Sequence, residues 1–404
     1  MKLSEILRER GYVYQHSSET LEEITDGPKR TIYLGIDPTA DSMHVGHLVC
    51  MLVLRHCIEN DHKVILLTGG GTGMIGDPGG KSEERNLLDD KTIKHNAAAV
   101  AAQMRQVFGT GDFIEENNAK WLSKLDLISF LRDIGKHFSV NSMIKKDTVK
   151  VRLDAESPIS FTEFSYALLQ SYDYMYLNEE YGCDVQVGGS DQWSNILAGV
   201  DFIRRKSAKT VYALTWPLLI NKSTGKKFGK SEGGAIWLDS KKTSVYQFYQ
   251  FWLNTEDEAI GEYLLKMTLL STQEIDEVLK AHAEDPSKRI GQKKLADEVT
   301  TLVHGKSETE KAEKSSNALF SGSIDDLGDD VATTPVAAGT SLVDALVAST
   351  LASSKREARQ FLEDGAVSLN GEKVSDRTLT ESDFKNGKAL LKRGKRNVCV
   401  LTLA

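Results

Sequence analysis

The sequence lacks the features that would place it in a membrane or outside the cell. Its four cysteines, Cys50, Cys57, Cys183 and Cys399, are scattered and form no CxxC pair. This excludes a disulfide framework and a cysteine zinc site, and it favours a reducing cytoplasm. No apolar run reaches the roughly 18 residues that a membrane span needs. The start of the chain has no apolar signal-peptide core, so we expect a cytoplasmic protein with no membrane partner.

An excess of positive charge is also missing. The formal net charge is −8, which argues against indiscriminate binding of nucleic acid. The charge is uneven, because residues 355–404 hold eleven Lys and Arg against seven Asp and Glu, which leaves −12 on the first 354 residues. A basic tail on an acidic body predicts a module for a polyanionic partner, although a solvated charged face explains the charge equally well.

Short apolar runs that end in glycine or aspartate predict a parallel sheet. TIYLGID (31–37) and KVILLTGG (63–70) enclose a segment with apolar residues at helical spacing, as in a strand–helix–strand crossover. CDVQVGGSDQW (183–193) and ALTWPLLI (213–220) predict two further strands. The fold class is therefore α/β with a Rossmann-type parallel sheet, and ligands are expected beyond the carboxyl ends of its strands.

The rest of the chain predicts two smaller domains. Residues 1–240 hold the predicted sheet, and residues 241–320 have helical patterns that indicate an all-α domain. Residues 321–340 lack periodicity and are rich in Ser, Asp, Gly, Thr and Ala, so we expect a linker. Residues 341–404 combine helical segments with Asn370-Gly371 between apolar runs, a hairpin signal, and predict a small α+β domain.

The motif HVGH (44–47) begins the helix between the first two predicted strands. A zinc pair would fit the spacing of His44 and His47, but no third ligand is evident nearby. Two buried structural histidines are a second interpretation, although they start the helix rather than lie inside it. A helix start also favours phosphate through its N–H groups and dipole. On that interpretation Gly46 allows close approach of a ligand and Thr39 adds a donor.

A glycine-rich stretch after the second strand matches a dinucleotide motif, with glycines at 71, 73 and 76. Asp77-Pro78 interrupts the helix that this motif should open, so we reject a dinucleotide site. The same stretch and the later GKKFGKS are each one residue short of a P-loop. The shortened loop does not wrap phosphate as a P-loop does, so an NTPase switch is also rejected.

The segment KKFGKS (226–231) has two interpretations. As a surface linker it would be unremarkable. As a glycine-containing flap it would close on polyphosphate through Lys227 and Lys230, most strongly while charge develops on a leaving pyrophosphate. Lys81 and Arg85 are positioned to supply further charge from another loop.

The segment 161–177 predicts a helix with a polar stripe. Tyr166, Gln170 and Asp173 fall at i, i+4 and i+7, on one face. Such a stripe is usually solvated. Here aromatic and aliphatic residues surround it, so it also suits the wall of a pocket for a small zwitterion with a hydroxyl group. In GGSDQW (188–193), Asp191 is a candidate acceptor for a ribose hydroxyl.

HVGH followed far downstream by KFGKS resembles the paired HIGH and KMSKS signature of class I aminoacyl-tRNA synthetases. Over almost its whole length the sequence resembles the bacterial tyrosyl-tRNA synthetase family. Six ordered stretches carry this resemblance: YLGIDPTADSMHVGHL, GDPGGKSEER, FLRDIGKHFSVNSM, FTEFSYALLQSYD, VQVGGSDQW and TGKKFGKSEGGAIWLD. The tail, SKREARQFLEDGAVSLNGEKV, resembles an RNA-binding module shared with a ribosomal small-subunit protein.

The resemblance implies roles for the matching positions, with Tyr33 and Asp173 on the substrate phenol. The implied tyrosine-binding residues are Tyr33, Asp77, Tyr166, Gln170, Asp173, Gln186 and Gln192. The implied ATP-binding residues are Gly35, Asp37, Gly46, Gly189, Asp191 and Lys230. The implied catalytic residues are Thr39, His44, His47, Lys81, Arg85, Lys227 and Lys230. Cys50 falls at a position that varies in the family and receives no role.

The resemblance also implies partners. These are tRNA(Tyr), L-tyrosine and ATP with Mg²⁺ as substrate, with no metal site and no tightly bound cofactor. A homodimer is implied, with 130–143 and Phe161 near its interface. Three alternatives stay open: a tryptophanyl enzyme, a small nucleotidylyltransferase that uses a similar helix start, and an RNA-binding protein with a decayed catalytic domain. Tyr33 with Asp173 and the basic tail favour tyrosine.

Overall fold

The computed structural model describes residues 1–78, 89–109, 111–220, 228–231, 234–321, 331, 333–394 and 397–404. The chain divides into two compact units. The first unit holds residues 1–238 and 258–284, and the second holds residues 239–257 and 285–404.

A six-stranded sheet forms the centre of the first unit, in the order β1-β6-β5-β2-β3-β4. β1 pairs antiparallel with β6, and the other pairs are parallel. The strands are β1 (Gln15–His16), β2 (Thr31–Ile36), β3 (Lys63–Thr68), β4 (Ile114–Asn117), β5 (Val185–Gly189) and β6 (Tyr212–Trp216). A separate short pair is β7 (Lys230–Ser231) and β8 (Gly234–Ala235). The predicted parallel sheet is thus confirmed.

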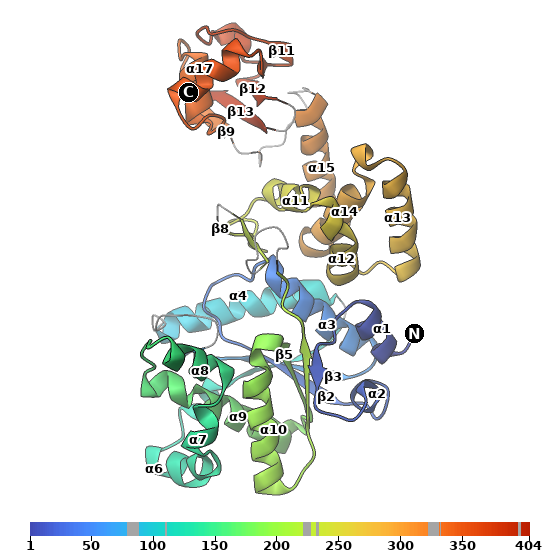
Figure 1. The fold of residues 1–404 in the computed structure, drawn as a ribbon, viewed down its shortest axis with the longest axis vertical. Coiled ribbons are helices and arrows are strands. Elements are labelled where there is room, and N and C mark those ends of the chain that lie inside the picture. The colour runs from blue at the N-terminus through green and yellow to red at the C-terminus, as the bar shows by residue number, and fades with distance from the viewer. Residues whose placement is uncertain are drawn as a thin grey trace. The chain divides into compact units, whose positions relative to one another are not determined.

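Helices cover both faces of this sheet, with α3 and α4 on one side and α9 and α10 on the other (Figure 1). The helices of the first unit are α1 (Leu3–Glu9), α2 (Leu21–Thr25), α3 (Leu48–Glu59), α4 (Asp90–Phe108), α5 (Ala119–Leu122), α6 (Leu127–Ser129), α7 (Val140–Met143), α8 (Asp147–Asp154), α9 (Phe161–Tyr181), α10 (Trp193–Ser207), α12 (Asp257–Met267) and α13 (Thr272–Glu284). Burial on both faces explains why β2 and β3 are almost continuously apolar.

The strand order reverses beside β2. The chain runs from β2 outward to β3 and β4, and it then returns to place β5 on the other side of β2. Neighbouring crossovers therefore leave β2 and β5 in opposite directions, which opens a crevice at the carboxyl ends of these strands. The fold itself fixes where a ligand can enter the sheet.

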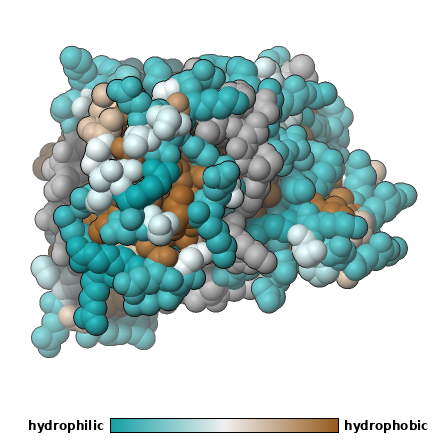
Figure 2. All heavy atoms as spheres, turned by 90° about the horizontal axis from the view of Figure 1, so that it is seen from above, coloured by the Kyte–Doolittle hydropathy of each residue, from teal (hydrophilic) through white to brown (hydrophobic). Residues whose placement is uncertain are grey.

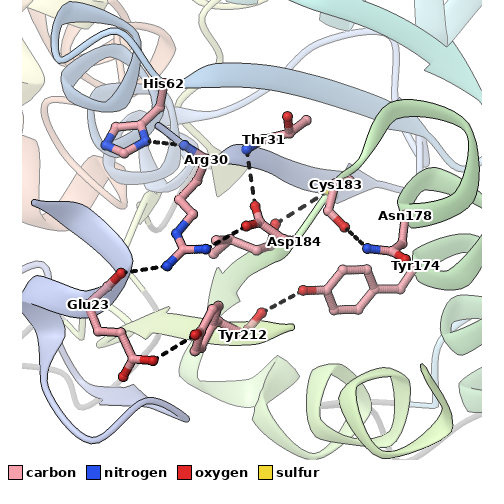
Figure 3. A network of polar contacts seen from close by, with 10 residues as sticks. Glu23, Arg30, Thr31, His62, Tyr174, Asn178, Cys183, Asp184 and Tyr212 are labelled. Atoms are coloured by element: carbon pink, nitrogen blue, oxygen red, sulfur yellow. Dashed lines mark hydrogen bonds and ion pairs between the residues drawn. The ribbon is translucent and has the colours of Figure 1, made fainter. Parts of the chain in front are cut away.

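Polar contacts join the opposite, amino ends of the strands (Figure 3). The Arg30 guanidinium donates to Asp184 at 2.8 Å and lies over the Tyr212 ring, while the Arg30 backbone N–H donates to His62 Nδ1 at 3.0 Å. The hydroxyl of Tyr174 donates to the Tyr212 carbonyl at 2.7 Å. Because all of these residues except Tyr174, which lies on α9, precede or begin β2, β3, β5 and β6, the network holds the strands together without occupying the crevice.

Arg10 explains why α12 and α13 belong to the first unit. Its guanidinium donates to the carbonyl oxygens of Leu265, Thr268 and Leu270 at 2.6–2.8 Å, and the hydroxyl of Tyr12 donates to the Lys266 carbonyl. Charge-assisted hydrogen bonds of this kind are stronger than neutral ones. They satisfy carbonyl groups that the end of α12 leaves without helical partners.

The second unit contains a helical part and a five-stranded sheet. Its helices are α11 (Val245–Leu253), α14 (Ile290–His304), α15 (Lys306–Ser321), α16 (Leu342–Ala348) and α17 (Lys355–Glu363). Its strands are β9 (Thr333–Val336), β10 (Val367–Leu369), β11 (Glu372–Lys373), β12 (Lys388–Arg393) and β13 (Asn397–Leu403), in the order β11-β10-β12-β13-β9. The predicted hairpin is confirmed, because β10 and β11 pair antiparallel around Asn370-Gly371, both with positive φ.

The prediction of a linker over 321–340 was wrong for part of this range. Residues 333–336 form β9, which pairs parallel with β13 at the edge of the sheet. An edge strand has a partner on one side only, and Pro335 is tolerated there because it costs no essential donor. A short strand with proline and no alternation gives little sequence signal. The C-terminal sheet therefore begins before the predicted boundary at 341.

Hydrophilic residues cover most of the face shown in Figure 2, with smaller hydrophobic patches between them. Among the described residues, no helix combines the length and the hydropathy that crossing a membrane requires.

Candidate active site

A cavity with a volume of about 440 Å³ lies at the crevice. It is lined from the carboxyl ends of β2, β3, β5 and β6. Most of the predicted site residues meet there: Tyr33, Gly35, Asp37, Thr39, His44, Gly46, His47, Asp77, Tyr166, Gln170, Asp173, Gln186, Gly189, Asp191 and Gln192. Residues that are up to about 160 positions apart in the sequence thus line the same cavity.

The structure does not describe the side chains of four predicted site residues. Lys81, Arg85 and Lys227 lie outside the described residues. The backbone of Lys230 lies in β7, but its side chain is outside the described part of the structure. The predicted phosphate clamp remains a prediction.

The two histidines of HVGH are held as neutral rings. The Gly46 N–H donates to His44 Nδ1 at 3.1 Å, and the His44 N–H donates to His47 Nδ1 at 3.2 Å. Because a backbone N–H only donates, Nδ1 is the acceptor in each ring and the proton lies on Nε2. Each imidazole therefore presents an Nε2–H donor without a full positive charge.

Burial keeps His47 neutral at any physiological pH. Removal of water from the ring lowers the pKa of His47 to about 3, and the neighbouring His44 adds to this. The two ring centroids are 4.1 Å apart. Two charged rings at this distance would repel each other, so the pair acts as hydrogen-bond donors rather than as cations.

The two signature segments touch each other. The helix start is the short helix η1 (Val45–His47), and the Val45 N–H donates to the Ile236 carbonyl at 2.9 Å. Gly229 has a φ of +92°, and a Cβ built there would lie 3.0 Å from the Gly46 nitrogen. A Cβ on Gly46 would lie 2.8 Å from the His44 ring and 3.1 Å from the Phe228 carbonyl. Glycine is therefore required on both sides of this approach.

A buried carboxylate lies at the other end of the cavity. Asp173 on α9 is only 2% exposed, and it accepts hydrogen bonds from Asn118 Nδ2 at 2.9 Å and Trp121 Nε1 at 2.7 Å. The hydroxyl of Tyr33 is buried and has no partner among the described residues. Because an unsatisfied buried hydroxyl is costly, this end of the cavity is prepared for a ligand that carries a polar group.

A chain of hydrogen bonds connects Asp173 to Asp37. Asn118 also donates to the Thr72 hydroxyl at 2.9 Å, and Thr72 donates to Asp37 at 2.7 Å. The hydroxyl of Tyr166 donates to the other Asp37 oxygen at 2.9 Å. Sequence reasoning missed Asn118, Thr72 and Trp121. Asn118 and Trp121 belong to a segment with no motif, and Thr72 lies inside a glycine-rich stretch that was interpreted by its glycines.

The middle of the cavity carries acceptors for a positively charged group. Asp77 accepts from Gln192 Nε2 at 2.7 Å. The Oε1 atoms of Gln170 and Gln186 are buried without a partner among the described residues. Three oxygen acceptors on a shared wall suit an ammonium group, which has three donors.

The zinc interpretation of HVGH has no support in the described part of the chain. No group of three His, Cys, Asp or Glu side chains there is arranged to hold a metal ion. His44 and His47 instead use their Nδ1 atoms for backbone N–H groups.

The affinity for a phenolic ligand is expected to depend on pH through Asp173. Burial raises the pKa of Asp173 to about 7, against the opposing hydrogen bonds from Asn118 and Trp121. The ionised carboxylate is the better acceptor for a phenol, so binding should release a proton below this pKa. A phenolic ligand should bind roughly tenfold more weakly at pH 6 than at pH 8, because the ionised fraction of Asp173 falls by about that factor.

Calorimetric titration with an amino acid that carries a phenol measures this effect. Buffers of different ionisation enthalpy report the proton that is released. A constant affinity from pH 6 to pH 8 with no proton release would show that Asp173 does not titrate in this range, which would contradict the prediction.

Comparison with known proteins assigns the class. The family model described as "tRNA synthetases class I (W and Y)" matches residues 25–321. A crystal structure of a C-terminally truncated Aspergillus nidulans mitochondrial tyrosyl-tRNA synthetase aligns with a TM-score of 0.71 at 32% identity, over 79% of this chain and 94% of that one. The fold and the paired signature thus define a class I tRNA synthetase.

The comparison also separates the two branches of this class. The model "Tyrosine--tRNA ligase SYY-like C-terminal domain" matches residues 323–401. Tyrosine–tRNA ligases from Roseiflexus castenholzii and Acetivibrio thermocellus are 46% and 45% identical, over 98% and 97% of both chains. A tryptophanyl-tRNA synthetase from Encephalitozoon cuniculi is 15% identical with a TM-score of 0.57 and shows the fold alone. The chain belongs to the tyrosine–tRNA ligase family.

Proposed function

We propose that the chain activates L-tyrosine with ATP and Mg²⁺ to tyrosyl-adenylate and pyrophosphate, and then transfers tyrosine to the 3′-terminal adenosine of tRNA(Tyr). One observation carries this proposal: the cavity has neutral histidine donors against the second signature segment and a buried carboxylate, Asp173, beside the unpartnered Tyr33 hydroxyl. A nucleotide and a phenol would find complementary groups at these two positions.

The geometry supports a mechanism without a protein nucleophile. The carboxylate of tyrosine attacks the α-phosphorus of ATP in line, and pyrophosphate leaves. His44 and His47 would donate Nε2–H to phosphate oxygens as charge moves onto the leaving group, with Thr39 beside them. Neutral donors of this kind stabilise the transition state through fixed orientation, because both rings are held by backbone N–H groups.

The same placement of the phenol and the nucleotide assigns roles to the remaining residues of the cavity. Asp173 and Tyr33 would bind the phenol. A site with these buried partners rejects phenylalanine, because their polar groups would be left without a partner; discrimination between tyrosine and phenylalanine is a known example of this effect. Asp77, Gln170 and Tyr166 would surround the ammonium group. Gln186 and Gln192 would lie near the amino acid, Gly35, Asp37 and Gly46 near ATP, and Gly189 and Asp191 near the ribose. Lys81, Arg85, Lys227 and Lys230 would clamp the pyrophosphate.

The second unit would bind the tRNA. The helical residues 241–320, of which 258–284 belong to the first unit, would face the anticodon side. The C-terminal domain would contact the phosphate backbone through its basic residues. Arg356 and Arg359 are exposed on α17, which supports this assignment. We place the reaction in the cytoplasm, where tRNA is charged and where four unpaired cysteines are stable.

A homodimer is part of the proposal. Eight exposed large hydrophobic residues fall between 127 and 161: Leu127, Ile128, Leu131, Val140, Ile144, Val151, Leu153 and Phe161. A soluble monomer rarely exposes so many together, and a second copy of the chain would cover them. Sedimentation of the wild type as a dimer and of Phe161→Glu as a monomer is expected; a monomeric wild type would contradict this assignment.

ATP–pyrophosphate exchange across the twenty amino acids tests the activity. Exchange should occur with tyrosine and be lower by several orders of magnitude with phenylalanine and tryptophan. Exchange with tryptophan alone, or with none of the twenty, would overturn the proposed function.

A further inference from the structure

Lys146 occupies a position that local structure does not explain. It is the N-cap of α8, and its carbonyl accepts from the N–H groups of Val149 and Lys150 at 3.0 and 2.8 Å. Ser, Thr, Asp and Asn are favoured at an N-cap, and a positive charge at the start of a helix opposes the helix dipole. The reason for a lysine here therefore lies at the far end of its side chain.

The ammonium group of Lys146 is buried. Its Nζ has no hydrogen-bond partner among the described residues, and it faces a small cavity of about 10 Å³ that is also lined by Pro78, Glu163 and Asn195. This volume is about that of one water molecule. A buried ammonium group is costly unless an opposite charge lies nearby.

Two acidic residues from other elements lie near Lys146. Glu163 on α9 already accepts from Arg152 Nη1 on α8 through both carboxylate oxygens, at 3.1 and 3.2 Å. Asp77, in the loop after β3, is the second. Burial lowers the pKa of Lys146 to about 8, and the negative charge of Asp77 opposes this lowering. Asp77 directly precedes Pro78, which lines the same small cavity as Lys146, so the two charged groups lie on neighbouring parts of the structure.

Asp77 connects Lys146 to the active site. It lines the large cavity, whereas Lys146 and Pro78 line the small one. Asp77 accepts from Gln192, whose own oxygen accepts from Asn195 at 3.4 Å. The carboxylate is therefore held by Gln192, and the small cavity that Lys146 lines is connected to it through Pro78 and Asn195.

We propose that Lys146 is a positioning residue for the amino-acid site: its buried ammonium group holds the Asp77 carboxylate in the orientation that faces the ammonium group of the bound amino acid. This inference rests on the proposed function, because it takes Asp77 as the partner of the substrate ammonium group.

The charge of the large cavity explains the need for such a group. Four aspartates line it, Asp37, Asp77, Asp173 and Asp191, and none of its described lining residues is Lys or Arg. Negative charges that share a cavity repel one another. A cation placed behind Asp77 offsets this effect without occupying space that the substrate needs.

The test compares Lys146→Met with Lys145→Met. Lys145 is the neighbouring exposed lysine, so the two variants make the same chemical change on the same segment. In exchange assays, K146M should raise the KM for tyrosine about tenfold and change kcat and the KM for ATP by less than about twofold. K145M should match the wild type.

Ligands with and without an ammonium group separate positioning from packing. K146M should bind tyrosine and tyramine about tenfold more weakly, and it should bind 3-(4-hydroxyphenyl)propionate, which has no ammonium group, within about twofold of the wild type. Lys146→Gln, a second variant that fills the small cavity with a neutral donor, should show the same selective loss. Equal weakening of all three ligands, unchanged binding or tighter binding of tyrosine would overturn the proposal.

A pH series adds a measurement that a purely structural role of Lys146 would leave unchanged. As the wild-type Lys146 loses its proton above pH 8, the ratio of tyrosine KM between K146M and wild type should fall toward one by pH 9.5. A constant ratio would contradict the role of the charge. If wild-type protein shows no exchange with tyrosine, the proposed function fails; if it does and the variants show no selective loss, the role of Lys146 alone fails.

Discussion

Replacement of His44 by alanine is expected to slow the formation of tyrosyl-adenylate by about a hundredfold, with the affinity for tyrosine unchanged within about twofold. Loss of one donor to developing charge typically costs 10²–10³ in rate. His44 lies at the helix start with Nδ1 occupied by the Gly46 N–H, so its removal leaves the phenol end of the cavity intact. The loss should therefore appear in the chemical step.

Rapid-quench measurement of adenylate formation and equilibrium titration with tyrosine separate the two quantities. His95→Ala is a suitable control, because His95 is exposed on α4 and does not line the cavity. Equal losses of rate and of tyrosine affinity in His44→Ala would show that the contact is made equally in the ground state.

Removal of residues 323–404 is expected to abolish charging of tRNA and to leave ATP–pyrophosphate exchange within about twofold of wild type. The cavity is built entirely from the first unit, whereas the basic tail belongs to the second. The cut is placed at 323 rather than at 341 because β9 is the edge strand of the C-terminal sheet. A cut at 341 would leave that strand without its partner.

A surface variant tests the same assignment without removing a domain. Arg356→Ala combined with Arg359→Ala takes two exposed charges from α17 and leaves the core of this domain, which includes Ala358 and Leu362, in place. Charging should fall about tenfold or more at physiological salt, and its dependence on salt should weaken. A truncated protein that charges tRNA normally would contradict an RNA-binding role for this domain.

The sequence predicted the elements whose signals are local. The helical spacing of 161–177 predicted α9, and apolar runs that end in glycine predicted β2, β3 and β5. The interruption at Asp77-Pro78 argued against a dinucleotide fold at the glycine-rich stretch; in its described part, residues 69–78, the structure has the short helix η2 (Thr72–Met74) and no longer helix. These conclusions needed neighbours along the chain and nothing more.

The features that the sequence did not predict depend on residues that are distant in the chain. Asn118 acquires its role through contacts to Thr72 and Asp173, which lie 46 and 55 positions away. Lys146 is conspicuous only once its Nζ is seen to be buried near Asp77. β9 is defined by its pairing with a strand more than sixty residues later. No periodicity or spacing rule carries such information.

The close approach of Gly46 and Gly229 restricts how the two signature segments can diverge in evolution. Because a side chain on either residue would meet atoms of the opposite segment, substitution on one side demands a compensating shift of the other backbone. In a saturation library selected for growth, both positions should accept almost no replacement, even though neither residue offers a functional group to the reaction.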